Sequence, residues 1–393
     1  MNGKLLVDGA VLTLNAGSSS LKFALFRAGA EVLRGQVSGI GTHPEAKAAR
    51  DGQALDPPAL HGTTHEEFLP GLLDWIGGHL DGAAIVAAGH RVVHGGTEFV
   101  EPVRITDAVM AGLEALVPLA PLHQPHNLSA IRAVAKALPE LPQVACFDTA
   151  FHSTMPEVAT WLPLPRGLRD AGLRRYGFHG LSYEFIAGRL RELSPALSAG
   201  RVVVAHLGNG ASLCAMQAGR SMETTMGFTA LDGLMMATRC GSLDPGALLY
   251  LMQSRGMPAR DVEDMLYHQS GLLGVSGISS DMRDLAASDD PRARQAVEVF
   301  MHRIVQCAGG LVAHLGGLDG VVFTAGIGEH DPALRAAVCA ALSWLGLALD
   351  DAANAAGGTA RISAAGSKVE AWVIPTDEEA VIARHAVAVL EHC

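Results

Sequence analysis

Three short stretches rich in glycine and small polar residues could each bind a phosphate group. They read NAGSSS at 15–20, HLGNG at 206–210 and AGIGEH at 325–330, and Lys22 follows the first of them. Small residues let a phosphate approach the backbone, N–H and hydroxyl groups donate to its oxygens, and a lysine neutralises its charge. One such stretch is equally typical of an ordinary tight turn. Three in one chain favour a nucleoside triphosphate, although none has the GxxxxGK[ST] form of a Walker-type ATPase.

Four polar side chains lie beside apolar segments, where charge is costly to bury. They are Arg91 in GHRVVHGG, Asp148 in CFDTAFH, His179 in YGFHG and Arg239 in MMATRCGSLDP. Buried ionic groups need partners, so four of them near strand ends suggest a shared site. A purely structural ion pair between Arg91 and Asp148 remains open as the alternative.

The 17 histidines form no recognisable transition-metal motif. A proline lies between His123 and His126, which excludes a helical pair of ligands there, and no third ligand follows at a zinc spacing. Magnesium needs few protein ligands because phosphate and water supply the others. The sequence is therefore compatible with Mg²⁺ bound together with a nucleotide.

The elements that must position these residues are predicted as alternating strands and helices, which indicates an α/β sheet covered by helices. A hairpin is expected from Val11–Leu14 and Leu21–Phe26, and the design recurs at Arg201–Leu207 and Ala211–Met216 as a weak internal repeat. Pro70 predicts a broken or late-starting helix within Glu66–Leu80. Further strands are predicted at Ala83–Ala88, Gln143–Phe147, Gly320–Phe323 and Lys368–Pro375. Helices are predicted at Thr106–Val117, Asn127–Leu138, Ser182–Leu193, Ala293–Leu315, which is expected to be buried all round, Pro332–Leu345 and Glu378–Leu390.

Composition narrows the classes of protein. A chain of 393 residues is long enough for two domains, and its formal net charge of −11 argues against nucleic acid as a partner. No uncharged run of about 18 apolar residues occurs, so we expect no membrane span. The first residues lack the apolar core of a secretory signal. The six cysteines form no CxxC pair, which favours reduced thiols and a cytoplasmic location.

Ten motifs over nearly the whole chain resemble those of the acetate kinase family, in the family's order. They are LNAGSSSLKF, GHRVVHGG, FDTAFHSTMP, YGFHGLSY, VAHLGNGAS, MGFTALDG, ATRCGSLDPG, GVSGISSDMRDL, FTAGIGEHDP and IPTDEEAVIAR. The resemblance implies an α/β fold of two related ribonuclease-H-like domains around a nucleotide cleft, as in actin, sugar kinases and heat-shock chaperone ATPases. It implies a first domain of residues 1–150 with 377–393 and a second of residues 151–376.

The resemblance also implies roles for residues that match the family's motifs. Catalytic roles fall to Asp148, His179 and Arg239. Arg91 would hold the substrate carboxylate, beside an acyl pocket of Val93, Leu122, Phe178 and Ala230. ATP would be bound by Ser18, Ser20, Lys22, His206, Leu207, Gly208, Asn209, Gly210, Asp281, Met282, Arg283, Gly326, Ile327, Gly328, Glu329 and His330. Mg²⁺, or Mn²⁺ in its place, is expected at Asn15 and Glu378, with Glu379 as the alternative to Glu378.

The activity implied by the resemblance is reversible transfer of the ATP γ-phosphoryl group to acetate, by a cytoplasmic homodimer with no nucleic-acid or membrane partner. A carboxylate is already a nucleophile, so the reaction needs positioning and charge stabilisation more than a base. Whether Asp148 moves a proton or only orients cations stays open. Ala230 stands where the family can have proline, and a smaller residue leaves room for a longer acyl chain. A propionate or butyrate kinase therefore stays open, as does a non-catalytic nucleotide-dependent switch of the same fold.

Overall fold

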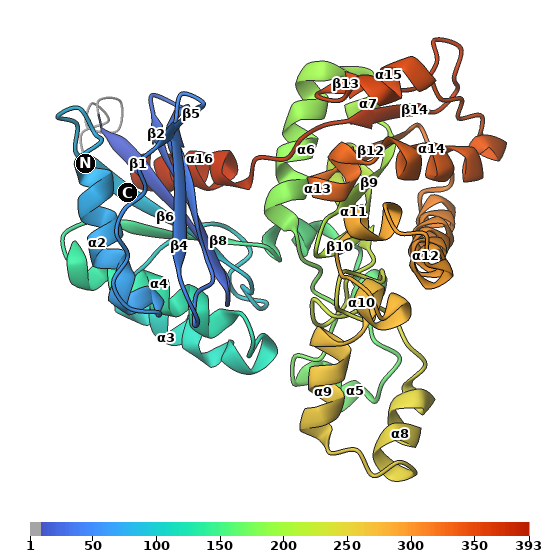
Figure 1. Ribbon diagram of the computed structural model, residues 1–393, viewed down its shortest axis with the longest axis horizontal. Helices are drawn as coiled ribbons and strands as arrows, with labels where there is room; N and C mark the ends of the chain where they lie inside the picture. The colour runs from blue at the N-terminus through green and yellow to red at the C-terminus, as the bar shows by residue number, and fades with distance from the viewer. Residues whose placement is uncertain (1–8, 393) are drawn as a thin grey trace. The chain divides into compact units, whose positions relative to one another are not determined.

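The computed structural model describes residues 9–392, which divide into two compact units (Figure 1). The first unit contains the chain up to Phe151 and again from Asp377 onward. The second unit is His152–Thr376. Each unit has its own sheet, so each can be described by itself.

The sheet of the first unit has eight strands in the order β5-β4-β3-β2-β1-β6-β8-β7. β1 pairs in parallel with β6 and β6 with β8, whereas the remaining neighbours are antiparallel. The predicted first hairpin is confirmed as β1 and β2, with Asn15 and Ala16 still inside the first strand. The strands are β1 Ala10–Ala16, β2 Ser20–Arg27, β3 Ala30–Ser38, β4 Glu45–Arg50, β5 Gln53–Leu55, β6 Ile85–Val92, β7 Val103–Arg104 and β8 Gln143–Phe147.

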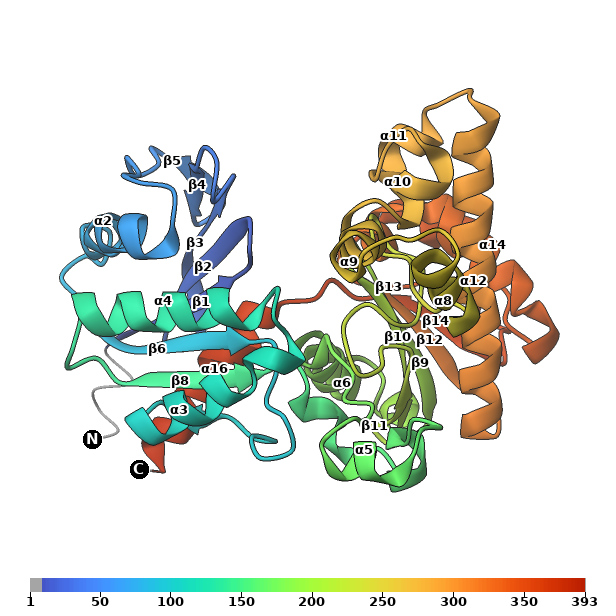
Figure 2. The ribbon, with the colours of Figure 1, turned by 90° about the horizontal axis from the view of Figure 1, so that it is seen from below.

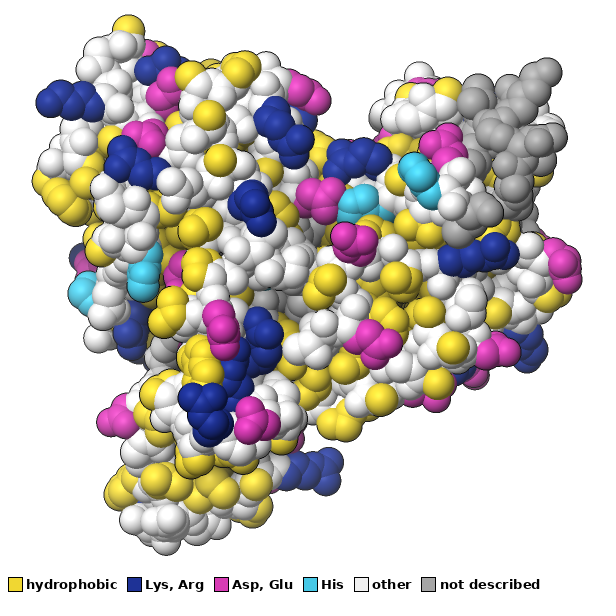
Figure 3. All heavy atoms as spheres, turned by 180° about the vertical axis from the view of Figure 1, so that it is seen from behind, with side chains coloured by type: hydrophobic (Ala, Val, Ile, Leu, Met, Phe, Trp, Pro, Cys, Tyr) yellow, Lys and Arg dark blue, Asp and Glu magenta, His cyan; other side chains and the backbone are white. Residues whose placement is uncertain are grey.

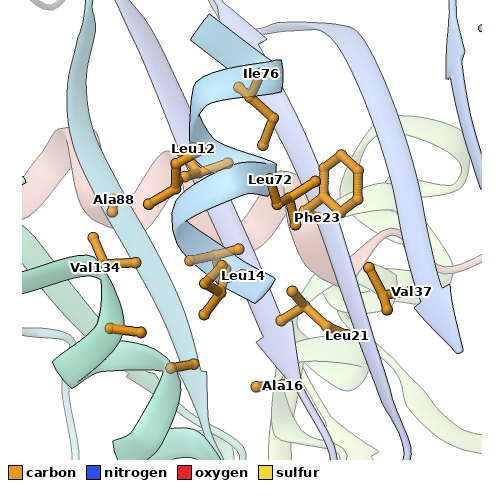
Figure 4. Close-up of a cluster of buried hydrophobic side chains, with 14 of the residues drawn as sticks. Leu12, Leu14, Ala16, Leu21, Phe23, Val37, Leu72, Ile76, Ala88 and Val134 are labelled. Carbon is orange, nitrogen blue, oxygen red and sulfur yellow. The ribbon is translucent and has the colours of Figure 1, made fainter. Parts of the chain in front are cut away.

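One face of this sheet packs against α2 (His65–Gly77) and α4 (Gln124–Ala137), as Figures 2 and 4 show. The core there joins Leu12, Leu14, Phe23 and their neighbours to apolar side chains of both helices. α3 (Asp107–Ala115) packs beside α4, followed by the short helix η1 (Val117–Leu119). Because side chains alternate along a strand, Asn15 lies on the opposite face from Leu12 and Leu14.

The opposite face of the sheet packs against α16 (Glu378–Glu391), which contacts β1, β6 and β8. Gly89 makes this close approach possible, because a β-carbon at that position would lie 2.5 Å from Cγ2 of Ile382 on α16. Arg91 is two residues further along β6, so it shares the α16 face. The fold therefore gathers Asn15, Arg91 and the first residues of α16 on one face of the sheet.

The sheet of the second unit has six strands in the order β11-β10-β9-β12-β14-β13. Its first five strands repeat the pattern β3-β2-β1-β6-β8, with antiparallel neighbours followed by parallel ones. The repeat seen in the two hairpins thus extends to five strands, which is the two-domain α/β fold that the sequence predicts. The strands are β9 Arg201–Leu207, β10 Ala211–Gln217, β11 Arg220–Thr224, β12 Gly320–Thr324, β13 Ala360–Arg361 and β14 Glu370–Val373.

The helices of the second unit include one long helix, α12 (Pro291–Leu315), which has the length and composition of a membrane span. Its buried residues recur at every third or fourth position and it packs against β10, so it is a core helix of this unit. The shorter helices of this unit, with η2 beginning at its border, are η2 Ala150–Thr154, η3 Glu157–Thr160, α5 Arg166–Asp170, α6 Gly180–Leu193, α7 Pro195–Ser198, α8 Pro245–Gln253, α9 Ala259–His268, α10 Gly271–Ser276, α11 Met282–Ala286, α13 Ala325–His330, α14 Pro332–Ala341, η4 Ser343–Leu345 and α15 Asp351–Ala356.

Three sequence predictions for these elements were wrong. α2 runs through Pro70 without a break, because burial of Phe68, Leu72 and other apolar residues outweighs one missing backbone hydrogen bond. AGIGEH is a short helix, α13, not a turn. α12 (Pro291–Leu315) is buried on one face only, since the charged and polar residues between its apolar positions face outward.

Candidate functional site

In the first unit, Arg91 and Asp148 form a buried ion pair. Arg91 is on β6, next to β8 in the sheet, and Asp148 directly follows β8. Nε of Arg91 donates to both carboxylate oxygens of Asp148, at 3.1 and 3.0 Å, and Nη2 donates to Oδ2 at 2.5 Å. Although burial opposes the charge, Asp148 raises the pKa of Arg91 above its ordinary value. Asp148 is only 1% exposed.

Asn15 connects this pair to the start of α16. Its Oδ1 accepts from Nη1 of Arg91 at 3.1 Å, and its Nδ2 donates to Oε2 of Glu378 at 3.4 Å. Glu378 is the first residue of α16, whose N-cap is Asp377. The two residues predicted to bind Mg²⁺ are therefore neighbours within one unit.

The acidic groups here fit a divalent cation. Burial raises the pKa of Glu378 to about 7, with Asp148 and Glu379 adding to the shift and Arg91 and Lys22 opposing it. Among the described residues, Oε1 of Glu379 is buried without a hydrogen-bond partner. Carboxylate and amide oxygens are the donors that Mg²⁺ takes. In residues 9–392 no cluster of three or more His, Cys, Asp or Glu forms a candidate metal centre, so water and phosphate oxygens would complete the coordination.

The NAGSSS segment turns tightly between β1 and β2, with the N–H of Gly17 donating to the carbonyl of Ser20 at 2.7 Å. Ser18 and Lys22 are exposed and Ser20 is partly buried, so their polar groups are accessible to a phosphate. A residue absent from the sequence prediction, Asn127 on α4, holds the turn. Its Nδ2 donates to the carbonyl of Ala16 at 2.6 Å, and its Oδ1 accepts from the N–H of Val93 at 3.0 Å.

In the second unit, His179 and His206 stack with their ring centroids 4.1 Å apart. Each ring is held at Nδ1 by a serine, His179 by Ser212 and His206 by Ser182, both at 2.8 Å. The hydroxyl of Tyr183 bonds in turn to Oγ of Ser212 at 2.5 Å. With Nδ1 held by Ser212, the Nε2 edge of His179 faces Gly210.

Gly210 lies where that edge meets Arg239. A β-carbon on Gly210 would be 3.1 Å from Nε2 of His179 and 3.9 Å from Nη1 of Arg239. Nη1 also donates to the carbonyl of Ala230 at 3.0 Å, so a predicted acyl-pocket residue orients the predicted catalytic arginine. The N–H of Ala237 donates to the carbonyl of Asn209, which fixes this loop to the HLGNG turn. His179 itself has a left-handed backbone, with φ 61°, of a kind that concentrates at functional sites.

The two glycine-rich segments of this unit also adjoin each other. β9 pairs with β12 so that His206 lies beside Thr324, and a β-carbon on Gly208 would be 3.6 Å from that of Ala325. Leu207, Gly208 and Asn209 are thus close to Gly326 at the start of α13, with Ile327, Gly328, Glu329 and His330 following. Asp281, Met282 and Arg283 begin α11, where the exposed Arg283 binds Asp281 at 2.6 Å.

The predicted site residues therefore form two sets, each gathered within its own unit. The first unit holds Asn15, Ser18, Ser20, Lys22, Arg91, Val93, Leu122, Asp148 and Glu378. The second unit holds the remainder, with Phe178 buried immediately before His179. The sequence prediction missed Asn127, Ser182, Tyr183 and Ser212. Each of them acts through a hydrogen bond to a residue at least 24 positions away along the chain, which the spacing of residues in the sequence does not reveal.

Comparisons with known proteins were made on the whole chain. Residues 10–384 match the model of the acetokinase family. An acetate kinase of Rhodopseudomonas palustris is 56% identical over 389 residues, which cover 96% of this chain and 98% of that protein. A propionate kinase of Francisella tularensis has a structure with a TM-score of 0.90 at 36% identity, covering 97% of this chain and all of that one. The acetate kinase of Porphyromonas gingivalis has a TM-score of 0.85, also at 36% identity, with the same coverage.

Proposed function

We propose that this chain, which belongs to the acetokinase family, is a kinase that transfers the γ-phosphoryl group of ATP reversibly to acetate, giving acetyl phosphate and ADP. The observation that carries the proposal is the meeting of His179, Arg239 and the HLGNG turn at Gly210. Two groups that can bear positive charge beside a phosphate-binding turn suit the developing charge of a transferring phosphoryl group.

Arg91 is proposed to bind the acetate carboxylate. Its Nε, one N–H of Nη1 and one of Nη2 already bind Asn15 and Asp148, which leaves one N–H on each terminal nitrogen. Two parallel N–H groups are the arrangement with which arginine binds a carboxylate. Both oxygens of Asp148 accept from Arg91, so we propose that Asp148 orients this arginine and does not take a proton.

ATP and ADP are the nucleotide substrates, and we propose that Mg²⁺, replaceable by Mn²⁺, accompanies them. Asn15 and Glu378, with Glu379 nearby, would hold the metal. When bound, the ion would neutralise charge on the phosphate oxygens. Ser18, Ser20 and Lys22 would contact phosphate from the first unit. His206–Gly210, Asp281–Arg283, Gly326–Gly328 and His330 would contact the nucleotide.

The decisive test is a panel of acyl substrates. Purified protein with Mg²⁺ and ATP is given acetate, propionate or butyrate, and the acyl phosphate is measured as its hydroxamate. We expect the highest kcat/KM with acetate. A higher kcat/KM with propionate would show that the protein is a propionate kinase instead. That activity is the second candidate because of Ala230 and because the chain is similar to the structure of a propionate kinase. ATP binding without carboxylate-dependent ADP release would instead indicate a nucleotide-dependent switch.

Removing the arginine of the second unit tests the mechanism. Arg239→Ala is expected to lower kcat by about 10³-fold, because the guanidinium would stabilise the phosphoryl oxygens in the transition state. Arg239→Lys should recover only part of the loss, since an ammonium lacks the planar fork. Turnover of Arg239→Ala near that of the unmodified protein would remove this residue from the mechanism.

We further propose that residues 1–150 with 377–393 and residues 151–376 are two actin-like ATPase domains of a cytoplasmic homodimer.

The apolar helix α8 supports association, because none of its residues is buried and Leu249 and Tyr250 are more than half exposed. Figure 3 shows hydrophobic side chains gathered at this end of the second unit. We propose that a second copy of this chain covers the exposed surface of α8. Leu249→Glu should give a monomer by light scattering, whereas Val158→Glu, at another exposed apolar position, should not; a dimer unaffected by Leu249→Glu would exclude α8 as its interface.

A further inference from the structure

We propose that Glu329 is a positioning residue that ties α13 to the end of the second unit, so that nucleotide binding at α13 and metal binding near Glu378 are coupled. The inference rests on the proposed function for its ligands. Its geometry, by contrast, lies wholly within the second unit.

One carboxylate oxygen of Glu329 accepts from three donors, which lie on two separate segments of the chain. Oε1 accepts from the N–H of Ala325 at 2.8 Å, the N–H of Thr376 at 3.2 Å and the hydroxyl of Thr324 at 3.5 Å. Thr324 ends β12, Ala325 begins α13, and Thr376 follows β14. These bonds occupy the oxygen within the protein, which favours a positioning role for Glu329 over the direct nucleotide contact that the family motif implies.

The first of these bonds holds a strained backbone. Ala325 has φ 65°, a left-handed conformation that costs an L-residue with a β-carbon about 1 kcal/mol or more. Such a conformation persists only where neighbouring groups fix it. The carboxylate of Glu329 accepts the amide at this turn, and it thereby sets the direction in which α13 leaves β12 (Figure 1).

Glu329 is also fixed from its backbone side. Arg335, only 1% exposed, donates from Nη1 to the carbonyls of Gly328 and Glu329, both at 2.9 Å. The same guanidinium donates to Asn354 through Nε at 2.8 Å and Nη2 at 2.7 Å. α13 is therefore held at both ends, and a displacement of its glycines would be transmitted through Glu329 to Thr376.

Thr376 is the last residue of the second unit, and Glu378 follows two residues later as the first residue of α16. The amide of Thr376 thus fixes the point from which the chain continues to the predicted metal residue. Loss of the Glu329 carboxylate should release this point even when the rest of the second unit stays folded. The expected consequence is weaker use of both ATP and Mg²⁺, with acetate binding unchanged.

Three variants separate this role from simple destabilisation. Glu329→Ala removes the acceptor, whereas Glu329→Gln keeps an Oε1 that can accept the same amides. Asp331→Ala is the matched control, because Asp331 caps α14 through the N–H of Leu334 at 2.9 Å and does not bind Thr376. Hydrogen–deuterium exchange is followed in peptides covering residues 374–381 and 325–331. KM for ATP, KM for acetate and the Mg²⁺ concentration for half-maximal rate are measured on each variant.

We expect Glu329→Ala to exchange at least tenfold faster at 374–381 and to raise KM for ATP and the Mg²⁺ requirement about tenfold, as loss of a hydrogen bond to a charged acceptor implies. Glu329→Gln should recover most of both effects, and Asp331→Ala should change neither. Unchanged exchange at 374–381 in Glu329→Ala, or the same changes in Asp331→Ala, would overturn the proposal. If the unmodified protein forms no acetyl phosphate, the proposed function fails, whereas the exchange comparison still decides whether Glu329 holds Thr376.

Discussion

At the scale of single residues, the candidate site of the first unit consists of side chains that bind one another. Arg91, Asp148, Asn15 and Glu378 form one connected set of hydrogen bonds. Removing one partner leaves a buried charge unpaired, which typically costs about 3–5 kcal/mol. A variant that tests activity at this site must therefore keep the shape of the side chain it replaces.

Asp148→Asn keeps that shape and removes the charge. We expect kcat to fall about 10²-fold, because an amide NH₂ facing Arg91 turns the guanidinium away from the substrate. The pH profile of kcat/KM between pH 6 and 9 should keep its form, since Asp148 orients a cation. Disappearance of one limb of the profile would instead identify Asp148 as the group that takes a proton.

A second arginine–aspartate pair provides the control for this variant. Arg201 and Asp319 of the second unit are joined at 2.7 Å, but their side chains are 36% and 41% exposed. Asp319→Asn should change the free energy of unfolding by at most about 1 kcal/mol, as for other exposed ion pairs. Its kcat should equal that of the unmodified protein.

His152 gives a prediction for stability as a function of pH. It is 2% exposed, its Nε2 donates to the carbonyl of Phe178 at 2.9 Å, and its Nδ1 accepts from Ser221 at 2.8 Å. Burial, with a contribution from Arg175, lowers the pKa of His152 to about 4. The unfolded chain therefore binds a proton first as the pH falls, so the stability present above about pH 6.5 is lost between pH 6.5 and 4.

The size of this loss is about 1.4 kcal/mol per pH unit where only the unfolded form is protonated. Urea unfolding at pH 7.5, 6 and 5 should show a shallower decline for His152→Gln than for the unmodified protein. Burial also lowers the pKa of His90 to about 4. Part of the decline in stability with falling pH should therefore remain in the His152→Gln variant as well as in the unmodified protein. His61→Gln, at an exposed position, is the control. Equal declines for His152→Gln and the unmodified protein would contradict the assignment.

At the scale of elements, helices and strands could be predicted from the sequence where the local residue pattern and the burial of the side chains favour the same structure. Apolar runs on either side of a small polar turn located both hairpins, and β8 was predicted at Gln143–Phe147 with its correct bounds. The effect of Pro70 was misjudged because the burial of one helix face outweighs it. AGIGEH was misjudged because the Glu329 carboxylate accepts the first amide of the segment and so stabilises the start of α13. Of the candidate site, motifs predicted the proposed reacting groups, whereas Asn127 and Ser212 act through long-range hydrogen bonds that no spacing along the chain reveals.

Gly89 tests how one element positions the site. A methyl group there would be 2.5 Å from Cγ2 of Ile382, so Gly89→Ala must displace α16, which begins with Glu378. We expect a loss of about 1–3 kcal/mol in the free energy of unfolding and a higher Mg²⁺ requirement. Ile382→Ala removes the methyl group that faces Gly89. In combination with Gly89→Ala, it should restore part of the free energy of unfolding and lower the Mg²⁺ requirement again. Gly71→Ala, on α2 with open space around it, should not destabilise the protein; a Gly89→Ala protein with unaltered Mg²⁺ dependence would show that α16 does not position Glu378.

At the scale of the whole molecule, the predicted acyl-pocket residues belong to both units. Val93, whose N–H is held by Asn127, belongs to the first, and Ala230, whose carbonyl orients Arg239, belongs to the second. Each unit repeats the same five-stranded pattern, yet neither contains the complete set of predicted acyl-pocket residues. If both residues line one pocket, their effects on selectivity must depend on each other.

A double-mutant cycle measures that dependence. Val93→Ala enlarges the pocket and should lower the ratio of kcat/KM for acetate to that for propionate about tenfold, because one methylene in an apolar pocket is worth about 1–3 kcal/mol. Ala230→Pro fills space and should raise the ratio. In the double variant the change should differ from the product of the single changes by about threefold or more, since a new cavity lets the proline be accommodated differently. The same cycle with Val158→Ala, an exposed residue, should be multiplicative. A multiplicative result for Val93 and Ala230 as well would mean that the two units select the acid independently, so that the acyl pocket is not shared between them.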